Sequence, residues 1–334
     1  MLSQKIKNKA VQLGYTACGI IQATGFDEYS RELDKRSKLF PGSKGIYDNF
    51  RGLASPPEDS KSIIVCTQRL NRYKVPKDME LLYGKMYLFD SRISYTTESR
   101  INMEFEAFLK MLGLKIIEGG VPVRWAGAKA GIGKFGRNNF LYDEKHGSYI
   151  NINTWIVDKE LDYDNTPEDT NLPACNDNCH KCIEACPTGA LSEKMLMDAG
   201  KCICRVQFDG NDALSDIKEK MGAWLYGCDV CQDVCPVNKN KFTENNEYPL
   251  LHEFVEFMKP EAVLSMDEDT YKEILHPRFW YAGEDNLWLW KCNALRSMIN
   301  SDDKKYHSLI KQNCDNEDER VSGVAKWGCK KLKL

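Results

Sequence analysis

A cysteine motif that occurs twice places the strongest constraint on this chain. Each copy has the spacing C-x2-C-x3-C followed by proline, at Cys179, Cys182 and Cys186 and again at Cys228, Cys231 and Cys235. Nine of the 14 cysteines fall between residues 175 and 235, and such clustering is typical of metal ligands. The repeated spacing therefore predicts that this segment folds around inorganic centres.

The spacing favours two 4Fe-4S clusters. In two-cluster ferredoxin modules the C-x2-C loop holds one cluster, and the cysteine before proline reaches across to the other. The predicted ligands are Cys175, Cys179, Cys182 and Cys235 for one cluster, and Cys186, Cys228, Cys231 and either Cys202 or Cys204 for the other. Two structural zinc ions are the alternative, because C-x2-C pairs also build zinc ribbons. The proline after the third cysteine of both copies favours the clusters.

The remaining sequence predicts three parts. Residues 1–165 are expected to form a mixed α/β domain, with strands over 17–21, 61–68 and 147–158, a helix over 101–112 and a strand and turn over 115–120. Residues 161–173 are acidic and read as a linker. A ferredoxin-like module is predicted over 166–245, and a short, mostly helical region over 246–334.

Charge and hydropathy limit where such a protein can act. The net charge of -3 gives no general attraction to nucleic acid or to an anionic membrane. No apolar run approaches the roughly 20 residues of a membrane span, and the first 15 residues read as an amphipathic helix without a signal-peptide pattern. We therefore expect a cytoplasmic protein with no membrane partner. Reducing conditions there argue against a disulfide framework.

Two adjacent clusters pass single electrons, so a chain of this size is expected to hold a second redox centre in its N-terminal part. The segment GIGKFG, residues 131–136, matches G-x-G-x-x-G by letter, but no clear strand precedes it. A dinucleotide site is therefore weakly indicated. The glycines would still let the backbone approach a bulky cofactor closely.

AGIGKFGRNNFLYDEKHGSYININTWIVD, CPTGAL, KCI and YGCDVCQDVCPVNK together resemble, in order and spacing, the epoxyqueuosine reductase family. The resemblance extends over most of the chain. It implies an N-terminal cobalamin-binding domain of the nitroreductase-like and reductive-dehalogenase-like type, and HEAT-like C-terminal helices. It also implies base-off cobalamin beside two 4Fe-4S clusters, an external electron donor such as ferredoxin or flavodoxin, and reduction of an epoxide on a tRNA wobble base to an alkene.

The same resemblance implies which residues contact the corrinoid. These residues belong to the glycine-rich loop and to the start of the next strand: Gly131, Gly133, Lys134, Phe135, Gly136, Arg137, Asn138, Gly147 and Ser148.

One feature of the family is missing. Its proton donor is an aspartate shortly before the glycine-rich loop, and residues 116–125 of this chain contain none. Glu118, Tyr95 and Arg124 are the alternative catalytic candidates; Arg124 could instead bind cobalamin side chains. The missing aspartate leaves open a reductive dehalogenase-like enzyme acting on a small molecule, or a non-catalytic protein that handles corrinoid or electrons.

Overall fold

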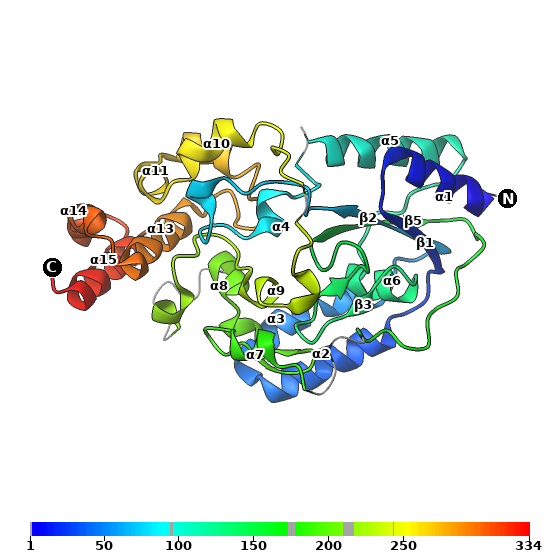
Figure 1. Ribbon diagram of the computed structural model, residues 1–334, viewed down its shortest axis with the longest axis horizontal. Coiled ribbons are helices and arrows are strands. Elements are labelled where there is room, and N and C mark those ends of the chain that lie inside the picture. The colour runs from blue at the N-terminus through cyan, green and yellow to red at the C-terminus, as the bar shows by residue number, and fades with distance from the viewer. Residues whose placement is uncertain (1, 94–95, 173–174, 176–177, 210–216, 243) are drawn as a thin grey trace.

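The computed structural model describes residues 2–93, 96–172, 175, 178–209, 217–242 and 244–334 (Figure 1). Its N-terminal part is built on an antiparallel sheet in the order β1 (Ala17–Gln22), β2 (Ser62–Arg69) and β5 (Ile150–Val157). These strands confirm the three predicted strands. The central strand β2 is buried over seven of its eight residues, in agreement with the apolar run of residues 63–66 in its sequence.

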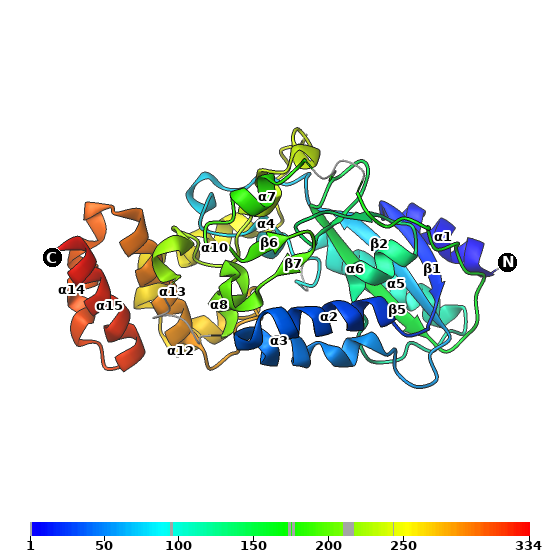
Figure 2. The same cartoon turned by 90° about the horizontal axis from the view of Figure 1, so that it is seen from below.

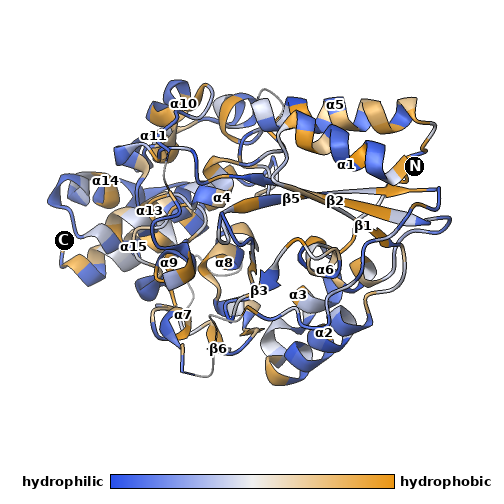
Figure 3. Cartoon of the chain, turned by 45° about the vertical axis from the view of Figure 1, so that its right-hand side comes forward, coloured by the Kyte–Doolittle hydropathy of each residue, from blue (hydrophilic) through white to orange (hydrophobic). Residues whose placement is uncertain are grey.

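Helices cover both faces of this sheet (Figure 3). They are α1 (Leu2–Leu13) and α5 (Thr97–Met111) on one face, and α2 (Asp27–Leu39), α3 (Lys44–Asn49) and α6 (Val123–Lys129) on the other. Side chains alternate along a strand, so Ile64 packs with the α1 and α5 side, whereas Ile63 and Val65 pack with the α2 and α6 side. The result is a sheet between two helical layers.

Helix α5 confirms the helix predicted from apolar spacing, and it begins earlier because Thr96 caps it. The Thr96 hydroxyl accepts a hydrogen bond from the Ser99 amide at 3.2 Å. The strand predicted over residues 115–120 is wrong, because only a single bridge joins Ile116 to Val157. The pairing stops at Gly119, whose φ of +143° is incompatible with an extended strand.

Gly19 lets β1 approach the end of α6 closely. An added Cβ at Gly19 would lie 2.8 Å from the Cβ and 2.9 Å from the carbonyl oxygen of Ala130. Gly19→Ala should therefore lower the free energy of unfolding by about 2 kcal/mol. Gly45→Ala is the control, since Gly45 in α3 has open space around it and the change should be neutral or slightly stabilising. Urea denaturation compares the two variants, and equal stabilities would contradict this account.

The cysteine-rich region consists of short elements. These are α7 (Lys181–Glu184), the hairpin β6 (Leu191–Glu193) and β7 (Leu196–Met197), α8 (Ile203–Asp209) and α9 (Val230–Asp233). The residues described in the acidic linker contain no helix or strand, but the linker is not free. The Asp164 carboxylate accepts hydrogen bonds from Lys7 Nζ at 2.5 Å and from the Ile20 amide at 2.8 Å, which fastens it to the sheet.

The C-terminal part is helical, as predicted. Its helices are α10 (Leu251–Met258), α11 (Pro260–Ser265), α12 (Glu268–Thr270), α13 (Leu287–Ser301), α14 (His307–Gln312) and α15 (Glu319–Leu332), with α4 (Lys85–Leu88) packed nearby from the N-terminal part. Short 3-10 helices occur at Pro41–Ser43, Arg51–Ala54, Lys77–Met79, Ala199–Lys201, Lys218–Met221, Pro236–Asn238, Lys304–Tyr306 and Asn313–Asp315, and a π-helical turn at Tyr271–Leu275. Figure 2 shows α14 and α15 at the end of the molecule opposite the N-terminus.

One hydrophobic core joins the three predicted parts. Tyr83 from the N-terminal part, Tyr226 from the cysteine-rich part and Trp290 of α13 are fully buried together. The rings of Tyr226 and Trp290 stack with their centroids 4.7 Å apart. The three parts are therefore packed as one body, with the cysteine-rich region between the other two.

Within the part of the chain that the structure describes, no helix combines the length and apolar character that a membrane span requires.

Candidate redox site

The two cysteine loops repeat the same backbone. In each, the cysteine before proline closes a turn onto a short helix. The Cys186 amide donates to the carbonyl of Ile183 at 3.2 Å, and the Cys235 amide donates to the carbonyl of Gln232 at 3.2 Å. Helices α7 and α9 of the two loops pack against each other. This pseudo-symmetric arrangement brings both sets of thiols into one region.

The first set gathers three cysteines of the first loop and one of the second. Burial raises the pKa of the Cys182 thiol to about 11. The charges of the neighbouring Cys175, Cys235 and Cys179 sulfurs raise this pKa as well, so these sulfurs lie close to Cys182. The Arg137 amide donates a hydrogen bond to Cys175 Sγ at 3.4 Å. Cys175 therefore lies with this set in spite of the extra residue in its spacing. Cys235 reaches it from the other loop.

The second set has the reciprocal composition. Burial raises the pKa of the Cys228 thiol to about 12. The charges of the neighbouring Cys202, Asp229 and Cys186 side chains raise this pKa further. Cys186 therefore lies with the second loop although it follows the first in sequence. The thiols predicted for each cluster are thus neighbours, although among the described residues no three of them are close enough to bind a single metal ion. The crossed ligation of a two-cluster ferredoxin stays a prediction. A buried thiol with a raised pKa is poorly ionised by itself, and cluster irons favour the thiolate.

Cys202 and Cys204 have different surroundings. The Cys202 sulfur lies close enough to Cys228 and Cys231 that its charge raises the pKa of both thiols. Cys204, at the start of α8, donates its thiol to the carbonyl oxygen of Cys228 at 3.7 Å and also forms a hydrogen bond with the Cys202 side chain. A thiol that donates its proton to a backbone carbonyl is protonated, whereas a cluster ligand is a thiolate. The arrangement favours Cys202 as the eighth ligand, with Cys204 as a supporting residue.

The glycine-rich loop forms a tight hairpin, with strands β3 (Lys134–Phe135) and β4 (Leu141–Tyr142). An added Cβ at Gly133 would lie 2.7 Å from the Tyr142 carbonyl oxygen, and one at Gly136 would collide with the Tyr142 ring. Gly131 adopts a φ of +70°. The hairpin by itself thus explains these glycines. The space beside Gly133 and Gly136 is filled by β4, and a corrinoid contact at these positions stays a prediction.

The end of this hairpin is attached to the cysteine loops. The Asn138 side chain donates to the carbonyl of Cys231 at 3.0 Å and to the Tyr142 hydroxyl at 2.8 Å. The carbonyl of Arg137, a buried residue, accepts from the Met195 amide at 2.9 Å. Lys134 is half-buried on β3. Arg137 and Asn138 therefore couple the N-terminal part to the cluster module.

Gly147 and Ser148 also face the cluster module. The Ser148 amide donates to Asn238 Oδ1 at 2.9 Å, and the Ser148 hydroxyl donates to Gln232 Oε1 at 2.8 Å. Gly147 has a φ of +68°, and a Cβ there would collide with the Asn238 side chain. Sequence reasoning missed Gln232 and Asn238. Their positions, beside Cys231 and after the second C-P, are the only signal that pointed to them.

Arg124, which is partly buried, lies beside the second cysteine set, and the buried Arg36 lies near Arg124. Arg124 donates to the carbonyl of Asn139 at 2.5 Å, and Arg36 donates to the carbonyl of Met195 at 2.8 Å. Burial, and then the charge of Arg36, lower the pKa of Arg124 to about 10. The nearby Cys202 sulfur opposes this change and raises the pKa of Arg124. Among the described residues, neither guanidinium forms an ion pair with a carboxylate, although the Glu32 carboxylate lies close enough to Arg36 to oppose the lowering of the Arg36 pKa by burial. This region fits negatively charged groups such as a thiolate-bound cluster or the cobalamin phosphate.

The other catalytic candidates are not at this place. Glu118 is exposed on the segment before α6. Tyr95 lies outside the described residues. Of the three candidates, Arg124 alone is shown beside the thiols.

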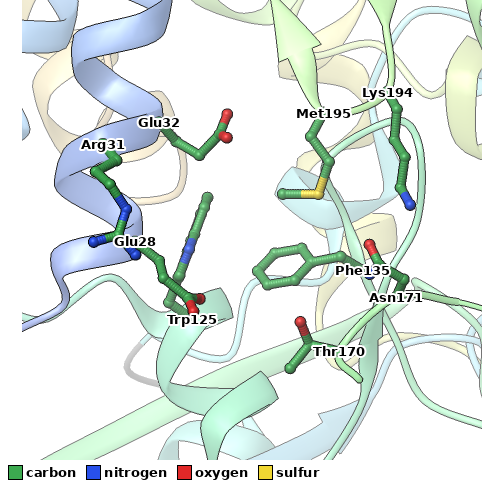
Figure 4. Close-up of a pocket in the computed structure, with 9 residues that line it drawn as sticks. All are labelled: Glu28, Arg31, Glu32, Trp125, Phe135, Thr170, Asn171, Lys194 and Met195. Carbon is green, nitrogen blue, oxygen red and sulfur yellow. The ribbon is translucent and has the colours of Figure 1, made fainter. Parts of the chain in front are cut away.

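A pocket of about 330 Å³ lies between α2, α6, β3, the linker and the turn joining β6 to β7 (Figure 4). It is lined by Glu28, Arg31, Glu32, Trp125, Phe135, Thr170, Asn171, Lys194 and Met195. The rings of Trp125 and Phe135 form its apolar side, with centroids 4.7 Å apart. Five separate segments build the pocket, so no local sequence pattern could have predicted it.

A sheet covered on both faces and joined to two neighbouring groups of thiols is the arrangement expected of a redox protein of the double-cluster class. Residues 174–238 match the family model described as a 4Fe-4S double cluster binding domain, which overturns the zinc alternative. Curated proteins named epoxyqueuosine reductase match most of the chain. The protein of Cellulophaga algicola is 30% identical over 81% of this chain and 88% of its own length, and that of Leadbetterella byssophila is 31% identical over 71% and 80%. The chain belongs to the epoxyqueuosine reductase family.

Solved structures agree with this fold. The epoxyqueuosine reductase of Bacillus subtilis superimposes with a TM-score of 0.78 at 22% identity, and that of Streptococcus thermophilus with 0.79 at 19% identity. Each match covers 99% of this chain and 90% of the other. The predicted fold class is confirmed. Family membership likewise confirms an oxidoreductase with two 4Fe-4S clusters and cobalamin as cofactors.

Proposed function

We propose that this protein reduces the epoxide of epoxyqueuosine in tRNA to the alkene. The names of its relatives support this substrate, and one epoxyqueuosine reductase of the same fold, with a TM-score of 0.77, was solved with an epoxyqueuosine-modified tRNA stem loop. The observation that carries the proposal is the group of thiols around Cys228 beside the partly buried Arg124. We also propose that the protein acts in the cytoplasm, as three domains with the predicted boundaries.

The electrons are proposed to come from an external donor such as ferredoxin or flavodoxin. The first cysteine loop is the entry point in this proposal, because His180 between its cysteines is exposed. Arg124 lies beside the second set. Bound cobalamin supplies the strongly reducing centre that the epoxide requires. Arg124 and Arg36 would stabilise negative charge there, and Lys134 and Arg137 are proposed as further contacts to the cofactor.

Glu118 is the proposed proton donor. It occupies the segment where the family carries its aspartate, and the neighbouring Gly119 and Gly120 permit the backbone to change conformation. One structure of the Bacillus subtilis protein has its catalytic aspartate loop swung out of the active site, so this loop can leave the active site in that protein. Tyr95 and Arg124 are the other candidates.

The test uses anaerobic protein loaded with iron, sulfide and cobalamin, a chemical reductant and tRNA that contains epoxyqueuosine. Nucleoside mass spectrometry should detect loss of one oxygen from the modified base. Glu118→Gln should reduce turnover at least about 100-fold while leaving both clusters and tRNA binding intact. Glu80→Gln, at another exposed carboxylate, is the control. Full activity of Glu118→Gln would exclude Glu118 as the donor, and no product with the unchanged protein would overturn the substrate.

A further inference from the structure

Five cysteines lie outside the cluster region, and four of them form two close pairs. Cys18 and Cys66 are directly opposite on β1 and β2. Cys314, in the turn after α14, and Cys329, in α15, have their sulfurs 3.2 Å apart. The redox site described above uses neither pair.

The two pairs differ in how accessible they are. Cys66 is completely buried in the sheet. Both members of the C-terminal pair are partly exposed, at the end of the molecule formed by α14 and α15 (Figure 1). The pair is packed among partly buried side chains such as Leu309 and Trp327, which hold the two elements together. A small reagent could therefore reach the C-terminal pair without opening the sheet.

We propose that Cys314 and Cys329 form a reversible dithiol–disulfide site, which a small disulfide such as oxidised glutathione converts to a disulfide that fastens α15 to the turn after α14. Closing the bond requires the sulfurs to approach by about 1 Å, to the usual length of about 2.05 Å. The elements already hold the sulfurs nearly in contact, so a change of side-chain rotamer is the main requirement. This inference does not depend on the proposed substrate.

The exchange proceeds in two steps. The Cys329 thiolate attacks one sulfur of glutathione disulfide, which forms a mixed disulfide and releases one glutathione thiolate. Cys314 then loses its proton and attacks the Cys329 sulfur, which releases the second glutathione. The two protein thiols are oxidised, one glutathione disulfide is reduced to two thiols, and two protons are transferred.

The order of attack follows from the surroundings of Cys314. Its sulfur contacts the Ile310 carbonyl oxygen at 3.7 Å and the Cys329 sulfur. Burial, and then the hydrogen bond with Cys329, raise the pKa of Cys314 to about 11. Cys314 therefore keeps its proton, which assigns the first attack to Cys329 and the resolving step to Cys314.

The experiment equilibrates the anaerobic, cluster-loaded protein with mixtures of reduced and oxidised glutathione, alkylates the remaining thiols and maps the peptides by mass spectrometry. The expected product is a cross-link between Cys314 and Cys329 at unchanged iron content. Cys314→Ser should accumulate glutathione on Cys329, and Cys329→Ser should form no cross-link. Cys18→Ser is the matched control and should behave like the unchanged protein.

Hydrogen exchange gives an independent readout. The cross-link should slow amide exchange in α15 at least about tenfold, because it removes conformational freedom from the opened segment. The proposal is overturned if the cross-link fails to form in fully oxidising mixtures, or if it appears only after iron has been lost. Equal glutathionylation of the two single variants would overturn the assigned order of attack.

Discussion

Cys186→Ala is expected to remove the cluster of the other loop and to spare the cluster of its own. The protein should then retain about four irons of about eight. The reason is the crossed arrangement, in which Cys186 lies with Cys228 and Cys202, whereas Cys182 lies with Cys235. Iron analysis and electron paramagnetic resonance of the anaerobically purified variant measure the outcome.

The reciprocal variant makes this test specific. Cys235→Ala should remove the cluster held by Cys175, Cys179 and Cys182, again with about four irons remaining. Combining Cys186→Ala with Cys228→Ala should cost no more iron than either change alone, because both cysteines serve one cluster. If that double variant lost both clusters, the crossed assignment would be wrong.

Cys202 and Cys204 provide the matched control. Cys202→Ala should lose the second cluster, whereas Cys204→Ala should keep about eight irons, because the Cys204 thiol is directed to the Cys228 carbonyl. The two residues differ by two positions on one segment, so a general unfolding of that segment would affect both variants alike. The reverse result would make Cys204 the ligand.

Much of the site could be predicted because its chemistry depends on local spacing. A C-x2-C-x3-C-P segment predicts three ligands within eight residues, and its repetition predicts six of the eight proposed ligands. Short apolar runs likewise predicted β1 and β2, because buried strands leave an apolar local pattern. The eighth ligand was ambiguous because Cys202 and Cys204 differ only in where the fold directs their sulfurs.

The remaining features depend on contacts between distant segments. Ser148 and Asn238 are 90 positions apart, and their hydrogen bonds become visible only when the sheet and the second cysteine loop are packed. The glycine-rich loop was expected to face a cofactor, but Tyr142 fills the space beside Gly133 and Gly136. A glycine in the sequence indicates that another group packs closely against the backbone. The sequence alone does not show whether that group is a cofactor or another part of the chain.

Lys85 forms another such distant contact, and replacing it should strongly destabilise the protein. Lys85 Nζ lies 3.2 Å from the Asp229 carboxylate, which is 2% exposed and sits between Cys228 and Val230 in the second loop. The Lys85 amide also donates to this carboxylate at 2.8 Å. Lys85→Met would leave the buried charge of Asp229 without its ionic partner. We expect a loss of about 3 kcal/mol in the free energy of unfolding, measured by urea denaturation of the cluster-loaded protein.

The pH dependence of Lys85→Met separates this charge effect from lost packing. Burial raises the pKa of Asp229, and Lys85 opposes that rise, so removing Lys85 should raise the pKa further. A carboxyl whose pKa is higher in the folded state is most favourable to folding below its unfolded pKa, and this contribution is lost as the pH rises through the folded value. Lys85→Met should therefore be less destabilised near pH 5 than near pH 8. Adding Asp229→Asn should restore most of the stability at pH 8, because it removes the unpaired charge. If Lys85→Met were equally unstable at both pH values and gained nothing from Asp229→Asn, the ion pair with Asp229 would not be the source of the stabilisation, and packing of the lysine side chain would account for it.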